Sequence, residues 1–124
     1  VVATAVGESN PSANGKSHYL MRPTSGAMLL GVVYRMFSNG CFSCAVVTRP
    51  PRPDFSQYHE KSIPCFLPHD KEVIHAWLGN EENQAVDELL SNPKIYCDLE
   101  VTKVKTFKSG EPLAPTTILP ASTR

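Results

Sequence analysis

The sequence has little of several features that mark common protein classes. No apolar run approaches the roughly 20 residues that a membrane-spanning helix needs, which excludes a transmembrane segment of that kind. Charge of one sign is not in excess, since 12 Lys and Arg residues balance 12 Asp and Glu residues, and this excludes a polybasic tail. Because 41% of the residues are hydrophobic, the chain is also too apolar to be mostly disordered.

Cysteine is scarce as well. Four cysteines in 124 residues are too few for a disulfide-stapled miniprotein. Cys41 and Cys44 form one C-x-x-C pair, whereas Cys65 and Cys97 stand alone, and a four-cysteine zinc site usually shows two such pairs. We therefore expect reduced, buried thiols, and we expect neither a metal site nor a cofactor. Reduced thiols in turn favour an intracellular compartment, either the nucleus or the cytoplasm.

Proline, by contrast, is abundant. The 11 prolines and 7 glycines predict a β-rich fold interrupted by frequent loops rather than a helical bundle. A chain of 124 residues has the length of one domain, and we predict a single α+β domain over residues 1–124. The proline-rich segment 110–124 is expected to be an irregular tail.

Asn39-Gly40 predicts a β-hairpin, because the two residues tolerate positive φ and separate two strand-like runs. Those runs, 28–37 and 41–48, are rich in β-branched and aromatic residues. The other expected strands are 18–21, which follows a loop at 9–16, and 95–101, where apolar and polar residues alternate.

Two short helices are predicted between this hairpin and the last strand. Asp70 is a suitable N-cap residue, the apolar residues after it recur at helical spacing, and Gly79 ends the first helix. Trp77 belongs to the apolar face of that helix and is expected in the core rather than at a ligand. The second helix spans about 82–91, and Asn92-Pro93 follows it.

The residues from Cys44 onward carry a more specific pattern. In order, they include Ala45-Val46-Val47-Thr48, a proline-rich turn, His59-Glu60-Lys61-Ser62-Ile63-Pro64-Cys65-Phe66-Leu67, and a helix with Ala76-Trp77-Leu78. This order and spacing resembles the SOS-response-associated peptidase (SRAP) family, which reads I-T-T, I-H-[DH]-R-M-P-x-I-L and W-L at these places. Upstream, Gly15-Lys16-Ser17-His18-Tyr19-Leu20 resembles the G-K-x-P-Y-F strand of that family.

The resemblance implies a partial SRAP-like barrel that binds single-stranded or abasic-site DNA. It covers only the C-terminal half to two-thirds of a complete SRAP domain. In that family the cysteine exposed by removal of the initiator Met bonds covalently to the abasic site, whereas no cysteine precedes Cys41 here. We therefore expect DNA binding without the covalent step, and no enzymatic activity from this chain alone.

Two site residues are implied by the resemblance. Glu8 stands where the family has the catalytic Glu of F-Y-E-W, and His59 matches the histidine of I-H-D-R-M-P. A carboxylic acid and an imidazole near the sugar could move protons during ring opening of an abasic site. One additional residue precedes Pro64, which places Lys61 or Ser62 at the position of the family's Arg. The alternative is that Glu8 is a solvated surface charge and His59 a polar loop residue.

Four basic residues are candidates for DNA phosphate contacts if their segments lie side by side, and scattered solubilising charge explains them as well. They are Arg35, Arg49, Arg52 and Lys61. Three functional hypotheses stay open: a DNA binder derived from the SRAP fold, a non-catalytic interaction module, and the C-terminal fragment of a complete SRAP enzyme. In the second, an incomplete barrel exposes sheet edges that pair with a protein partner or with another copy.

Overall fold

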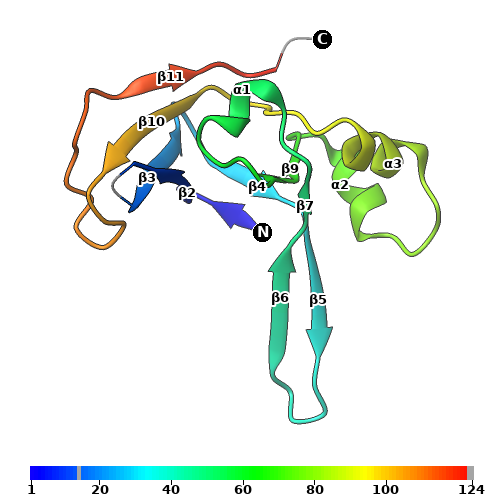
Figure 1. Cartoon of the computed structure of the whole chain (residues 1–124). Coiled ribbons are helices and arrows are strands. Elements are labelled where there is room, and N and C mark those ends of the chain that lie inside the picture. The colour runs from blue at the N-terminus through cyan, green and yellow to red at the C-terminus, as the bar shows by residue number, and fades with distance from the viewer. Residues whose placement is uncertain (14, 123–124) are drawn as a thin grey trace.

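The computed structural model describes residues 1–13 and 15–122, and this part of the chain forms four antiparallel sheets and three short helices (Figure 1). The sheets are open, and the predicted β-rich α+β class is confirmed. The helices are α1 (Pro53–Ser56), α2 (Lys71–Leu78) and α3 (Gln84–Ser91). The strands are β1 (Val2–Ala3), β2 (Val6–Ser12), β3 (Gly15–Pro23), β4 (Met28–Leu30), β5 (Val32–Met36), β6 (Phe42–Val46), β7 (Thr48–Arg49), β8 (Ile63–Pro64), β9 (Phe66–Leu67), β10 (Leu99–Val104) and β11 (Thr117–Leu119).

The largest sheet has the strand order β11-β10-β3-β2. Strands β2 and β3 pair from Val6↔Met21 to Ser12↔Gly15, so the loop predicted at 9–16 is wrong. The polar residues of β2 have low strand propensity, and pairing with the apolar β3 overrides that propensity. Pro11 is tolerated in β2 because this strand forms the outer edge of the sheet.

The core lies where this sheet meets α1 and the segment that follows it. Met21, Phe55, Ile63 and Leu99 are each 0% exposed and belong to one apolar cluster. Alternation along β2 and β3 directs Val6 and Met21 toward this cluster, and Glu8 lies on the same side of β2 as Val6. The sheet therefore carries one acidic side chain on its core face.

The hairpin predicted at Asn39-Gly40 is confirmed. Strands β5 and β6 pair, the Phe37 amide donates to the Cys41 carbonyl over 2.8 Å, and Gly40 has a φ of 83°. Only Gly40 of the two turn residues takes a positive φ, which is typical of a three-residue loop with a glycine bulge. Cys44 lies on β6 and Cys41 just before it, and both thiols are exposed, so the expectation of buried thiols is wrong for this pair.

Gly31 interrupts the strand predicted over 28–37. Before it, β4 pairs with β1 and β9, and after it, β5 pairs only with β6 among the described strands. The indole of Trp77 lies over Gly31, and its Nε1 donates to the Val32 carbonyl over 3.4 Å. Because residue 31 has no side chain, the backbone can pass beneath the indole ring from one sheet into the next.

The two predicted helices are confirmed. The Asp70 side chain accepts hydrogen bonds from the amides of Glu72 and Val73, which is the N-cap arrangement that the sequence predicts. Asn83 caps α3 in the same way. Trp77 is half-buried and packs against a second apolar cluster around Cys65, Leu67 and Leu89, as predicted for a core residue.

The segment 110–124 is not entirely irregular, as the sequence had suggested. Strand β11 pairs with β10 through Leu99↔Leu119, and Leu119 is buried. The apolar side chain of Leu119 therefore closes one end of the core. No helix in residues 1–13 and 15–122 is long and apolar enough to cross a membrane.

Candidate functional site

The structure brings Glu8 and His59 together. Glu8 lies on the edge strand β2, and His59 lies three residues after the end of α1. The distance between His59 Nδ1 and Glu8 Oε2 is 3.5 Å, and the side chains are 27% and 14% exposed, respectively. The alternative of a solvated Glu8 on the surface is therefore wrong.

Asn10 attaches the segment after α1 to the edge of the sheet. Its Nδ2 donates to the carbonyls of Ser56 and Gln57 over 3.4 and 3.2 Å, and its Oδ1 accepts from the Glu60 amide over 3.0 Å. These bonds cover the outer edge of β2, which would otherwise expose unpaired backbone groups. They also hold His59 beside Glu8, since His59 lies between Gln57 and Glu60. The role of Asn10 was not predicted, because a lone asparagine in a polar segment gives no sign of the loop that it will contact.

The hydrogen bonds of His59 determine which ring nitrogen is available. Nδ1 lies 2.8 Å from the carbonyl oxygen of Ser9, and a carbonyl can only accept, so Nδ1 carries the proton of this bond. In the neutral ring, Nε2 is then an acceptor that is free of this contact. The arrangement therefore presents an imidazole of fixed orientation next to a carboxyl group.

Burial changes the acidity of Glu8. Desolvation raises the pKa of the Glu8 carboxyl above its ordinary value, and the charge of His59 opposes this shift to a smaller extent. Tyr19 lies directly across the ladder from Glu8 and packs edge-to-face on Tyr58, with 5.1 Å between ring centroids. Two aromatic rings thus limit the access of water from this side. A carboxyl group with a raised pKa is a better proton donor near neutral pH than an exposed one.

This shift has a consequence for stability. A raised pKa means that the folded protein binds the Glu8 proton more tightly than the unfolded chain, so stability falls as pH rises through the folded-state pKa. Glu8→Gln removes the ionisation, and we expect it to raise the free energy of unfolding at pH 7 by about 0.5–1 kcal/mol. At a pH below about 3, where Glu is protonated in both states, the difference should disappear.

Urea unfolding at the two pH values measures this difference, and Glu60→Gln is the matched control. Glu60 is exposed, and its side chain lies outside the Asn10 contacts. Its replacement should change the free energy of unfolding little at either pH. A Glu8→Gln protein that is as stable as the parent at pH 7 would show that burial of the carboxylate carries no energetic penalty.

The candidate phosphate-binding residues do not gather around this pair. Arg49 Nε donates to the Leu90 carbonyl at the end of α3, and Arg52 donates to Asp54 and to Ser122 Oγ. These two guanidinium groups therefore hold segments of the fold together. Arg35 is exposed on the β5/β6 hairpin, with its guanidinium 5.2 Å from the centre of the Phe37 ring, and Lys61 is exposed two residues after His59. Lys61 is thus the candidate nearest to the pair along the chain.

Charge is divided along the sequence, a feature that the balanced total conceals. Residues 9–53 contain no Asp or Glu, while their basic residues are Lys16, Arg22, Arg35, Arg49 and Arg52. Most of the acidic residues follow Asp54, and several lie on or beside α2 and α3. The β-strands before α1 therefore form the basic part of the chain, and the helical part is acidic.

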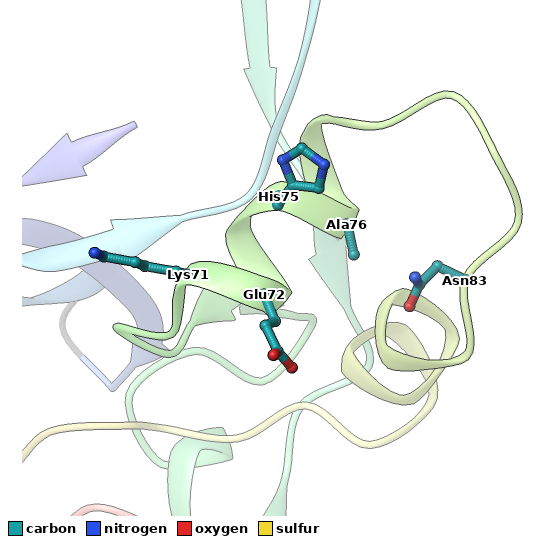
Figure 2. A pocket seen from close by; sticks show the side chains of 5 residues that line it. All are labelled: Lys71, Glu72, His75, Ala76 and Asn83. Atoms are coloured by element: carbon teal, nitrogen blue, oxygen red, sulfur yellow. The ribbon is translucent and has the colours of Figure 1, made fainter.

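A concave site lies between α2 and the start of α3, with a volume of about 410 Å³. It is lined by Lys71, Glu72, His75, Ala76 and Asn83, and Figure 2 shows Lys71, Glu72 and His75 pointing away from one another. Side chains that diverge cannot act on one bound group. Within residues 1–13 and 15–122, no group of three or more His, Cys, Asp and Glu side chains could hold a metal ion.

Comparison with known proteins found no match among protein families, curated proteins or solved structures. The Glu8–His59 pair therefore has to be interpreted from its own geometry and from the sequence pattern that singled it out.

Proposed function

We propose that this chain is a SRAP-like domain that binds single-stranded DNA and recognises abasic sites without bonding to them covalently. The observation that carries the proposal is the 3.5 Å approach of Glu8 and His59. These two residues are more than 50 positions apart and were selected by their resemblance to the family's acid–base residues. Their meeting in the fold is what a shared site requires, and it supports the resemblance.

The chemistry of an abasic sugar suits this pair. Loss of the base leaves a hydroxyl group at C1′ beside the ring oxygen O4′. A protonated Glu8 would donate to O4′, and His59 Nε2 would accept from the C1′ hydroxyl, because Nδ1 is held by the Ser9 carbonyl. Both bonds would be made inside a half-buried site, where hydrogen bonds are stronger than in water. A sugar that carries a base has no hydroxyl at C1′ and would therefore make only one of these two hydrogen bonds.

The segment 9–53, which contains basic residues and no Asp or Glu, supports an attraction between this chain and the phosphate backbone of DNA. Basic residues without neighbouring carboxylates attract the phosphate groups of DNA. This attraction weakens as the salt concentration rises. Of the four candidate residues, Arg35, Arg49 and Lys61 are exposed, but Arg49 and Arg52 donate to groups within the fold. We therefore assign phosphate contact to Arg35 from this segment and to Lys61, which lies after the segment, beside Glu60 and two residues from His59.

Titration of fluorescent single-stranded DNA, with and without one abasic site, tests this function. We expect binding that falls about tenfold or more when salt rises from low to moderate, and tighter binding to the abasic strand. Glu8→Ala and His59→Ala, which leave no side-chain donor or acceptor at these positions, should each reduce the preference for the abasic strand by about five- to tenfold, which corresponds to the loss of one hydrogen bond to a buried group. Binding to intact single-stranded DNA should change little in either variant.

Glu60→Ala is the matched control and should keep the preference for the abasic strand, since Glu60 is exposed. Each sample is also run on a denaturing gel. An adduct that survives the gel would contradict the expected absence of a covalent step and would direct attention to another cysteine or amine. Absence of binding to both strands at low salt would overturn the proposed function.

A further inference from the structure

The β5/β6 hairpin projects from the rest of the molecule (Figure 1) and has two different faces. The register places Val32, Tyr34, Met36, Phe42, Cys44 and Val46 on one side, which we call the apolar face. Tyr34 and Phe42 lie diagonally across the ladder on this face, with 6.2 Å between ring centroids. The opposite face carries Val33, Arg35, Phe37, Cys41, Ser43 and Ala45, and of these Val33 and Phe37 are 60% and 44% exposed.

The apolar face is exposed to an unusual degree. Tyr34, Met36 and Phe42 are 69%, 61% and 65% exposed, and Val46 is 43% exposed. Together these side chains present roughly 450 Å² of surface, which is as large as the largest apolar patch of a typical monomer. A two-stranded hairpin is at best marginally stable in water without a covering layer. The geometry therefore calls for a partner on this face.

The apolar surface continues past the base of the hairpin. An open cavity of about 560 Å³ is lined by Val32 and Tyr34 from the apolar face and by Val2, Trp77 and Leu78 beside it. Val2 and Leu78 are 69% and 74% exposed. With them the continuous apolar surface reaches roughly 700 Å², close to the ~800 Å² that each partner contributes to a standard protein interface.

We infer that the apolar face is a dimer interface that packs against the same face of a second copy of this chain. The area is sufficient for a specific dimer, and a two-fold axis pairs the patch with itself. The six residues of the face include no charged side chain, so two copies meet without repulsion. A nucleic acid fits less well, because the hairpin's one cation, Arg35, lies on the other side. This inference does not depend on the proposed DNA binding.

Labelling of the two exposed thiols of the hairpin tests the proposed dimer interface without any substitution in the protein. Cys44 lies on the apolar face and Cys41 on the opposite one, so only Cys44 should become hidden on dimerisation. We expect the rate of maleimide labelling at Cys44 to fall about fivefold or more as the protein concentration rises from about 1 to about 100 µM, because dimerisation follows mass action. Labelling of Cys41 should change little. Mass spectrometry of the labelled peptides separates the two sites.

Light scattering after gel filtration provides the second measurement. The parent protein should approach twice the mass of 13.6 kDa at the higher concentrations. Phe42→Ser should remain monomeric, and Phe37→Ser, which alters an aromatic residue on the opposite face, should still dimerise. A monomer at every concentration with equal labelling of the two thiols would overturn the inference, and so would protection of Cys41 in place of Cys44. Protection of Cys44 that requires added single-stranded DNA would assign the face to nucleic acid instead.

Discussion

Replacement of Phe55 by alanine is expected to lower the free energy of unfolding by about 3–5 kcal/mol. The Phe55 ring is 0% exposed, belongs to the main apolar cluster and contacts the ring of Tyr58 at 6.3 Å between centroids. A four-residue helix such as α1 cannot be stable by its own hydrogen bonds, so its position depends on this one buried anchor. The loss should therefore exceed the transfer energy of the ring alone.

The same substitution should remove the proposed recognition of abasic sites. The amides of Tyr58 and His59 donate to the Phe55 carbonyl over 2.9 and 3.3 Å, so a shift of α1 also moves the imidazole away from Glu8. Phe55→Leu, which keeps most of the volume, should cost only about 1 kcal/mol and allows the DNA titration to be run on a folded protein. Unfolding in urea, followed by the fluorescence of the single tryptophan, measures the stability.

Phe37→Ala is the control for Phe55→Ala, since Phe37 is 44% exposed and lies on the hairpin far from α1 along the chain. It should change the free energy of unfolding by less than about 1 kcal/mol. Equal losses from the two substitutions would show that Phe55 does not anchor α1.

Replacement of Gly31 by alanine should be the next most disruptive change, with an expected loss of about 1–3 kcal/mol. A Cβ atom at position 31 would lie 2.6 Å from a ring carbon of Trp77, which is closer than van der Waals contact permits. The indole would have to move, and α2 with it, because the bulky ring cannot yield as a flexible chain can. Trp77 should become more exposed, with fluorescence shifted to longer wavelength.

Gly79→Ala is the matched control at the end of α2. There the nearest atom to an added Cβ is the Ala76 carbonyl oxygen at 3.4 Å, and φ is −78°, which any residue adopts. Stability and emission should remain close to those of the parent protein. An unchanged emission spectrum in Gly31→Ala would show that Trp77 does not seat against Gly31 in solution.

Local patterns in the sequence predicted the local elements well. The Asn39-Gly40 hairpin and the helix after Asp70 both formed, because turn and cap geometry depend on neighbouring residues. Strand β2 and strand β11 were missed, since their polar and proline-rich sequences become strands only by pairing with β3 and β10. Helix α1 is too short to produce a periodic pattern.

The candidate site divides in the same way. The resemblance in sequence predicted Glu8 and His59 as site residues, and the fold brings their side chains together. Asn10 could not be predicted, because its role depends on which loop covers the edge of β2. The four basic residues were selected by charge alone, and charge does not distinguish Arg49 and Arg52, which donate hydrogen bonds to other segments of the fold, from Arg35 and Lys61.

The attachment of the α1 segment through Asn10 determines the fraction of molecules in which His59 lies beside Glu8. Glu8 belongs to the sheet, whereas His59 belongs to a short segment held by one buried ring and a few hydrogen bonds. Such a segment can open while the sheet stays folded, at a free-energy cost well below that of global unfolding. Under the proposed function, the fraction of molecules able to bind the sugar is governed by this local equilibrium, and a bound ligand that bridges Glu8 and His59 would shift it toward the closed state.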